Sequence, residues 1–455
     1  MPANRRQMIR SLAAGGLLLP GMLSELLGEQ ALGASDPLMP KKPHHRPRAK
    51  RVIFLYMTGG VSHIDSFDPK PELRRYHNEK VADPGYCKGA DWKFSRYGEC
   101  GLEVSELFPE IGSLADRIGL IRSMWTDNND HFGASIAIHT GSSNFNRPSI
   151  GSWVSYGLGS ESQNLPSFMV ISPGLPYGGG QVWGSDFLPV VHQGTRLRPV
   201  AEPIPNMRPL ASRSLQQTEL DMLGYLNRQH LVGRETDPNL AARIRSFETA
   251  FGMQNAAPEV FDLSSETEET HALYGLEPGS RDSFAWQCLV ARRLAERGVR
   301  FIELIDTDSN SGNNWDTHGK MARYNQLARN VDRPIAALVK DLDRRGMLED
   351  TLVVWTTEFG RNPFAPNKGA TGRGHHRHAF STWMAGGGIR GGMVYGKTDQ
   401  WGNHVVEDKV TVHDLHATIL HQLGMDHTQL TYRHAGRDYR LTDVHGRVVR
   451  ELIDS

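Results

Sequence analysis

Acidic and histidine side chains follow the apolar segments of this chain in the sequence. The apolar runs cover residues 52–57, 118–122, 299–305 and 351–356. The side chains that follow them are, in chain order, His63, Asp65, Asp130, His131, Asp316, His318, Glu358, His376 and His378. Carboxylate and imidazole groups are ligands for zinc, manganese and similar divalent ions, and they also serve as general acids and bases. Several such loops in one chain predict a site for a divalent metal ion such as zinc.

Some of these positions have a purely structural interpretation as well. Asp65 could cap a turn, and Asp130 could be the N-cap of the segment behind it, with His131 solvated. Glu358 follows a buried run, where a charge is costly unless a metal ion or a cation such as Arg361 compensates it. Both interpretations stay open from the sequence alone.

The apolar runs alternate with helical segments. Residues 284–296 carry apolar side chains at helical spacing before the run 299–305, and residues 324–342 do so before the run 351–356. This alternation predicts an α/β fold with a mostly parallel sheet and helices on both faces. In such sheets the working residues lie in loops at the carboxyl ends of the strands, so the side chains above are expected to converge.

The N-terminus resembles a twin-arginine export signal. The pair Arg5-Arg6 precedes a small, apolar run at 11–19, and Gly33-Ala34 offers a cleavage site, so we expect residues 1–34 to be a signal peptide. The run is short for a membrane span, so no stable span is expected after processing. The predicted partner is the twin-arginine export machinery, and the predicted location is periplasmic or extracellular.

The rest of the chain divides by composition. Residues 35–50, rich in Pro, Lys and His, are expected to form a linker, and residues 51–455 one body with an inserted cap at about 173–258. The 51 basic and 51 acidic residues cancel, so nothing indicates a nucleic-acid partner. Of the three cysteines, Cys87 and Cys100 could pair in an oxidising compartment or remain free.

Several motifs carry a resemblance to a known family. They are Gly59 to Lys70, Arg147 to Trp153, Trp315 to His318, Glu358 to Arg361, and Val412 to Leu420. Together they resemble the exported "domain of unknown function 1501" family, over nearly the whole chain behind the signal. That family is similar to the alkaline phosphatase and sulfatase superfamily, so the resemblance implies a three-layer α/β/α sandwich with metal ions at the strand ends.

The superfamily's nucleophile does not carry over. In several branches a Ser, Thr or Cys lies ten residues before the Gly of a Thr-Gly pair. Counting back from Thr140-Gly141 gives His131, and no Cys-x-Pro-x-Arg sulfatase signature occurs. His131 could attack directly, ligate the metal, or act as general base for a water held by the metal. Asp130 is the acidic group beside it.

Other superfamily positions map onto residues of this chain. Asp316 and His318 resemble the carboxylate and imidazole pair of the third loop, and His376 or His378 resembles the late histidine ligand. Glu358 stands where an Asp-His pair is expected, with Phe359 in place of the histidine. Asp65 or His63 would replace the ligand near the first strand, and Arg361 or Arg373 could bind a substrate anion.

A glycine-rich motif offers a competing interpretation. Gly386 to Gly391 matches Gly-x-Gly-x-x-Gly, which suggests a dinucleotide site only if it opens a helix, yet Met393 to Gly396 continue as strand or turn. We therefore expect a glycine-rich hairpin. The sequence favours an exported, metal-dependent hydrolase of an anionic phosphate or sulfate ester. The alternative is a non-catalytic secreted binding or envelope protein with the same fold.

Overall fold

The computed structural model describes residues 36–82, 85–205, 212–232, 234, 238–277, 279–308 and 314–454. The predicted export signal, residues 1–34, lies outside the described residues. No helix among the described residues combines the length and the hydropathy that crossing a membrane requires.

A nine-stranded sheet forms the centre of the molecule. Its strands in spatial order are β15 (Met393–Tyr395), β6 (Ile118–Trp125), β14 (Phe380–Ala385), β10 (Thr351–Thr356), β1 (Arg51–Met57), β9 (Phe301–Asp306), β7 (Phe168–Ile171) and β8 (Thr195–Leu197), with β18 (Val410–Thr411) paired to β6. Only β14 runs antiparallel to its neighbours β10 and β6. The predicted mostly parallel sheet is confirmed.

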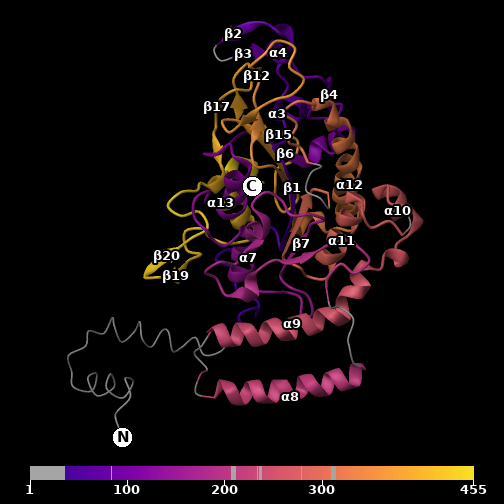
Figure 1. Cartoon of the computed structure of the whole chain (residues 1–455), viewed down its shortest axis with the longest axis vertical. Helices are drawn as coiled ribbons and strands as arrows, with labels where there is room; N and C mark the ends of the chain where they lie inside the picture. Colours follow the sequence, from indigo (N-terminus) through magenta and orange to yellow (C-terminus); the bar gives the residue numbers. More distant parts are fainter. Residues whose placement is uncertain are drawn as a thin grey trace, which may run out of the picture.

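Two hydrophobic cores lie on opposite faces of this sheet, as β1 illustrates. Ile53, Leu55 and Met57 enter the core that contains α11 (Phe284–Glu296) and α12 (Tyr324–Arg344). The alternate residues of β1 enter the core of α6 (His131–Thr140), α7 (Ile150–Leu158) and α13 (Val412–Gln422). Figure 1 shows α11 and α12 on one side of the sheet and α7 and α13 on the other. The predicted three-layer sandwich is therefore confirmed.

Shorter helices and strands lie around the central sheet. The short helices are α3 (His63–Ser66), α4 (Pro71–Arg75), α5 (Pro109–Gly112) and α10 (Glu268–Tyr274). The short strands are β2 (Lys80–Ala82), β3 (Gly85–Cys87), β4 (Phe94–Tyr97), β5 (Leu102–Ser105), β11 (Gly360–Arg361), β12 (Phe364–Ala365), β13 (His375–His376), β16 (Lys397–Thr398), β17 (Val405–Glu407), β19 (Tyr432–His434) and β20 (Arg437–Tyr439).

The predicted insertion contains two long helices, α8 (Arg213–Leu231) and α9 (Pro238–Phe261). Figure 1 shows them side by side at one end of the molecule, with α9 nearer the body. A Cβ added to Gly252 of α9 would lie 3.0 Å from the side chain of Asn164, in the loop that enters β7. α9 therefore packs near the end of the sheet at which β7 begins.

Three further features bear on the sequence interpretation. Residues 36–50 have no regular structure, but they lie along the body, where Leu38 and Ala49 are buried and the backbone N–H of His45 donates to the carbonyl of Gly424. All three cysteines are free. The glycine-rich motif at 386–391 forms a turn that leads into β15, not into a helix, so the dinucleotide interpretation has no support. The predicted hairpin is wrong as well, because β15 pairs with β6 and not with β14.

Candidate metal centre

The N-terminus of α6 places His131 at the carboxyl edge of the sheet. Asp130 is the N-cap, and its carboxylate accepts a hydrogen bond from the backbone N–H of Gly133 at 3.0 Å. His131 is the first helical residue. Its Nδ1 lies 2.6 Å from Oε1 of Glu358, and its Nε2 lies 3.3 Å from Oδ1 of Asp316. The imidazole therefore bridges two carboxylates from different strand-end loops.

Glu358 is fully buried just beyond the end of β10. Its carboxylate accepts hydrogen bonds from the backbone N–H of Gly59 at 2.8 Å, from the Tyr56 hydroxyl at 3.1 Å and from the Thr357 hydroxyl at 3.0 Å. Burial opposes ionisation, but the hydrogen bond and charge of His131 outweigh it and lower the pKa of Glu358. Glu358 is thus an ionised group whose oxygens are already occupied by donors.

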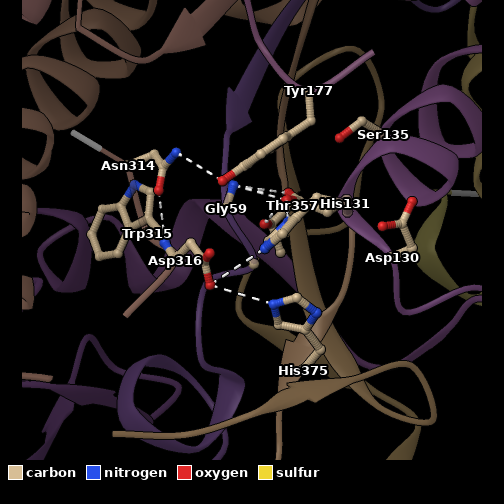
Figure 2. Close-up of polar contacts among 12 residues, drawn as sticks. Gly59, Asp130, His131, Ser135, Tyr177, Asn314, Trp315, Asp316, Thr357 and His375 are labelled. Atoms are coloured by element: carbon tan, nitrogen blue, oxygen red, sulfur yellow. Dashed lines mark hydrogen bonds and ion pairs between the residues drawn. The ribbon is translucent and has the colours of Figure 1, made fainter. Parts of the chain in front are cut away.

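Asp316 is the point at which the other charged groups meet. Its Oδ1 lies 2.7 Å from Nη2 of Arg361, 3.0 Å from Nε2 of His318 and 3.4 Å from Nε2 of His375. The side chain of Asn314 accepts a hydrogen bond from the backbone N–H of Asp316 and so fixes the turn. Burial raises the pKa of Asp316, but its hydrogen bonds and the charge of Arg361 hold it well below its usual range. Figure 2 shows His131 and His375 beside this carboxylate.

His375 and His318 turn their Nε2 atoms toward each other. The Nδ1 of His375 lies 2.7 Å from the carbonyl oxygen of Asn129, so Nδ1 carries the proton and donates it. Its Nε2 is then a lone-pair donor, only 2.7 Å from Nε2 of His318. At this distance Nε2 of His318 either donates its proton to Nε2 of His375 in a hydrogen bond, or both nitrogens face a bound cation. The tautomer of His375 therefore presents a ligand atom to the centre of the cluster.

The donor set of this cluster fits a metal ion. One ligand atom each of His131, Asp316 and His375 lies within 4.8 Å of the other two, a spacing at which the three can hold an ion. Nε2 of His131 is buried, and it faces Oδ1 of Asp316 at 3.3 Å in a contact that lacks hydrogen-bond geometry. Burial lowers the pKa of His131, but Asp316 and Glu358 outweigh it and raise the pKa to about 9. The site thus favours a positive charge here, and nitrogen and oxygen ligands suit zinc and related divalent ions.

Two glycines allow the loops of the cluster to approach one another. A Cβ on Gly59 would lie 2.6 Å from the backbone nitrogen of Asp316, and Gly59 has a φ of +109°. A Cβ on Gly372 would lie 1.8 Å from the carbonyl oxygen of His318. Any larger residue would push the Asp316 and His318 loop away from its neighbours.

Aromatic rings enclose the imidazole of His131. Tyr177 stacks on one face, with ring centroids 4.3 Å apart and planes inclined by 12°, and Phe359 lies 4.7 Å away. The Tyr177 hydroxyl accepts a hydrogen bond from the side-chain amide of Asn314 at 3.4 Å (Figure 2). Burial, followed by the nearby Asp316 and Glu358 charges, raises the pKa of Tyr177, so the phenol keeps its proton at neutral pH.

Asp65 and Arg373 pair with each other outside the cluster, whereas Arg361 supports Asp316 within it. Asp65 and Arg373 form a fully buried ion pair at 2.7 Å, and the Ser62 hydroxyl also donates to Asp65. Arg361 is buried too, and its guanidinium donates to Asp316 and to the backbone carbonyls of Gly60 and Arg373. Neither guanidinium faces solvent, so the structure gives neither an open position for a substrate anion.

His63, His376 and His378 lie in a separate histidine group. Nε2 of His63 donates to the carbonyl of Gly402 at 2.8 Å, and Nε2 of His376 donates to the carbonyl of Asn403 at 2.6 Å. Burial, followed by the charge of His63, lowers the pKa of His376 to about 3. The rings of His376 and His378 lie 5.5 Å apart. With their Nε2 atoms bonded to carbonyls, His63 and His376 do not join the cluster around Asp316.

The structure thus joins His131, Asp316, His318 and Glu358 of the predicted residues, and it adds His375 and Tyr177. His375 and His376 are consecutive residues of β13, so their side chains point to opposite sides of the strand. The pairing of His375 with Arg361 across the two short strands decides which of them enters the cluster. The sequence contains both histidines, but it does not show which of the two side chains faces the cluster.

One comparison decides the family. The model of the family described as "Protein of unknown function (DUF1501)" matches residues 49–453. The chain belongs to the DUF1501 family. No curated protein matches this DUF1501 chain.

Solved structures similar to this DUF1501 protein include a sulfatase, a phosphonate monoester hydrolase and an alkaline phosphatase. A sulfatase from Pseudoalteromonas sp. is 15% identical, with 90% of this chain and 72% of that chain covered at a TM-score of 0.37. A phosphonate monoester hydrolase from Silicibacter pomeroyi is 12% identical, with 89% and 77% covered at 0.36. An alkaline phosphatase from the Antarctic bacterium TAB5 is 14% identical, with 78% and 95% covered at 0.30.

Proposed function

We propose that this DUF1501 protein is an exported, metal-dependent hydrolase of phosphate or sulfate esters. One observation carries the metal centre: the ligand atoms of His131, Asp316 and His375 converge, while the second ring nitrogen of each histidine is held by Glu358 or by a backbone carbonyl. Export rests on the twin-arginine pattern, and the ester class rests on the motifs that resemble the alkaline phosphatase and sulfatase superfamily.

The residues of the cluster divide into ligands and supports. His131, Asp316 and His375 would hold the ion, with His318 beside them. A divalent ion bound there supplies a Lewis acid that polarises an ester oxygen and lowers the pKa of water. Glu358 fixes the ring of His131 through Nδ1, and Arg361 fixes the carboxylate of Asp316. With both ring nitrogens of His131 engaged, we assign that residue a ligand role rather than that of a nucleophile.

Tyr177 is the group placed to contact a substrate. Its ring covers His131, and its protonated hydroxyl can donate a hydrogen bond to an ester oxygen beside the ion. The Asn314 amide contacts the same hydroxyl and limits its rotation.

His318 favours a second candidate function. Its Nε2 lies 3.0 Å from Asp316 and 2.7 Å from His375, so it can supply a fourth protein ligand. Four protein ligands are typical of structural zinc sites, whereas catalytic sites keep one position open. A closed site of this kind would suit the non-catalytic secreted protein. The imidazole of His318 is 56% exposed, however, which favours a ligand that leaves when substrate enters.

Metal content is the first test. Protein purified without chelator should contain one equivalent of a divalent metal by elemental analysis, and His131→Ala, Asp316→Ala and His375→Ala should each lose it. His376→Ala and His378→Ala are matched controls from the neighbouring histidine group and should retain it. Metal-free wild-type protein would end the metal-centre proposal.

Hydrolysis is the second test. The metal-loaded protein is assayed with phosphomonoester, phosphodiester and sulfate-ester substrates, before and after removal of the metal by chelation. Turnover of at least one class that disappears with the metal supports the hydrolase. A protein that holds metal and turns over none of the three classes supports the non-catalytic candidate.

A further inference from the structure

Helix α6 presents a row of polar side chains to the sheet at intervals of four residues. They are His131, Ser135 and His139, and each meets a partner on a different strand or strand end. The contacts are His131 to Glu358 at 2.6 Å beyond β10, Ser135 to Tyr56 at 2.7 Å on β1, and His139 to Glu303 at 2.7 Å on β9. Only the first contact belongs to the metal centre described above.

The pair of His139 and Glu303 is buried in an apolar core. Both side chains are 1% exposed, and Glu303 lies beside Phe54 in the sheet register, on the face of the core that contains α6 and α7. Nδ1 of His139 donates to the carbonyl of Ser135 at 2.6 Å, and Nε2 faces Oε1 of Glu303 in a charge contact that lacks hydrogen-bond geometry. Buried ionisable pairs are often no more stabilising than apolar residues of similar size. A contribution to the stability of the fold therefore does not by itself explain the buried pair of His139 and Glu303.

The burial of α6 bears on what fixes the rotation of this helix about its own axis. Every residue from His131 to Thr140 is buried except Phe132, so the helix has no broad solvent face. A helix that is buried on nearly every side has no boundary between an apolar and a solvent face to fix its rotation. Ile136 and Ile138 are its bulky buried apolar side chains, whereas Gly133, Ala134 and Ala137 are small. The polar contacts of the row add directional restraints to this packing.

We propose that His139 and Glu303 are positioning residues that set the rotation of α6 and thereby aim Nε2 of His131 into the metal centre. Eight residues of helix separate the two histidines, about 12 Å along the axis. Tyr56 connects the two ends of the row, because its hydroxyl contacts Glu358 and Ser135 and its ring lies 4.6 Å from the ring of His139. This role rests on the proposed metal centre, since it acts through His131.

The test replaces the pair by apolar residues. His139→Leu/Glu303→Leu should keep or raise the midpoint of thermal unfolding, yet weaken divalent metal binding at least tenfold in a competition titration with a chromophoric chelator. The protein loaded with Co²⁺ should also show a changed visible absorption spectrum, because the ligand field depends on the orientation of His131. A purely structural pair would change neither metal measurement.

A matched control comes from the same core. His192 is a buried histidine whose Nδ1 contacts the Ser155 hydroxyl at 2.9 Å on α7, a helix that supplies none of the four side chains around Asp316. Ser155→Ala/His192→Leu should leave the metal affinity and the Co²⁺ spectrum unchanged. A loss equal to that of the His139 and Glu303 variant would overturn the positioning role.

Two further results separate the possibilities. Wild-type protein that binds no metal overturns the metal centre and this role together, whereas wild-type binding with unchanged affinity in the double variant overturns this role alone. If the double variant does not fold, the nearly isosteric Glu303→Gln takes its place. We expect that variant to bind metal severalfold more weakly, and an unchanged affinity would contradict the proposal.

Discussion

Nδ1 of His131 and Oε1 of Glu358, 227 residues apart in the chain, lie 2.6 Å from each other in the buried interior. The carboxylate fixes both the orientation and the tautomer of the imidazole, which leaves Nε2 directed at Asp316. Glu358 therefore acts on the cluster through the histidine, and its own oxygens are filled by Gly59, Tyr56 and Thr357.

Glu358→Gln should weaken metal binding by about 10- to 100-fold, the usual effect of removing a carboxylate that orients a histidine ligand. The amide of glutamine would also confront the donating N–H of Gly59. The dissociation constant is measured by chelator competition, with the exposed Glu407→Gln as control. A binding constant within twofold of wild type would argue against the supporting role of Glu358.

His318→Ala separates an open centre from a closed one. If His131, Asp316 and His375 hold the ion, the variant retains one equivalent of metal with a dissociation constant raised by about tenfold or less. It should also retain turnover, since an exposed imidazole leaves an open position behind. Complete loss of metal from this variant would instead identify His318 as an obligatory ligand of a closed structural site.

Arg373→Ala should destabilise the protein by about 3 to 5 kcal/mol, because it leaves the fully buried carboxylate of Asp65 without its cation. The double variant Asp65→Asn/Arg373→Met removes both charges and should recover part of this loss. Urea unfolding gives the free energies. Metal content should remain at one equivalent in the folded double variant, because neither side chain touches the cluster.

Asp306→Asn should stabilise the protein in a pH-dependent way. Burial, only partly offset by the hydrogen bond from Trp315, raises the pKa of Asp306 from 3.8 to about 7. Between about pH 4 and 7 the folded protein holds a proton that the unfolded chain has lost, so this group lowers stability as the pH rises through that window. The variant should gain roughly 2 kcal/mol at pH 8 and almost nothing at pH 4. An equal gain at both pH values would show that Asp306 does not titrate as described.

Much of the fold was accessible from the sequence because its signals are local. The apolar runs that became β1, β9 and β10 are buried on both faces, so they lack alternation and stand out. The helix predicted at 284–296 matches α11 residue for residue. The antiparallel β14 was not predicted, since strand direction depends on its long-range pairing with β6 and β10.

The site was accessible only in part, for a physical reason. Asp316 and His318 share one tight turn, so local spacing found them, and His131 followed from a motif count. The choice of His375 over His376 depends on the strand parity of β13, which forms only when β11 lies beside it. Asp65 carries the right chemistry, but its partner Arg373 comes from a distant segment that the sequence did not place there.

The ligand atoms of the cluster come from the N-terminus of α6, the loop behind β9 and the short strand β13. No fragment of the chain that stops before β13 contains all of them, and none of the three segments places a ligand until the sheet between them has closed. The amount of bound metal would therefore report the fraction of molecules in which all three segments have folded together. A chain that ends before β13 would stay empty, so one measurement of bound metal distinguishes such fragments from chains that have folded through β13 before any assay of catalysis.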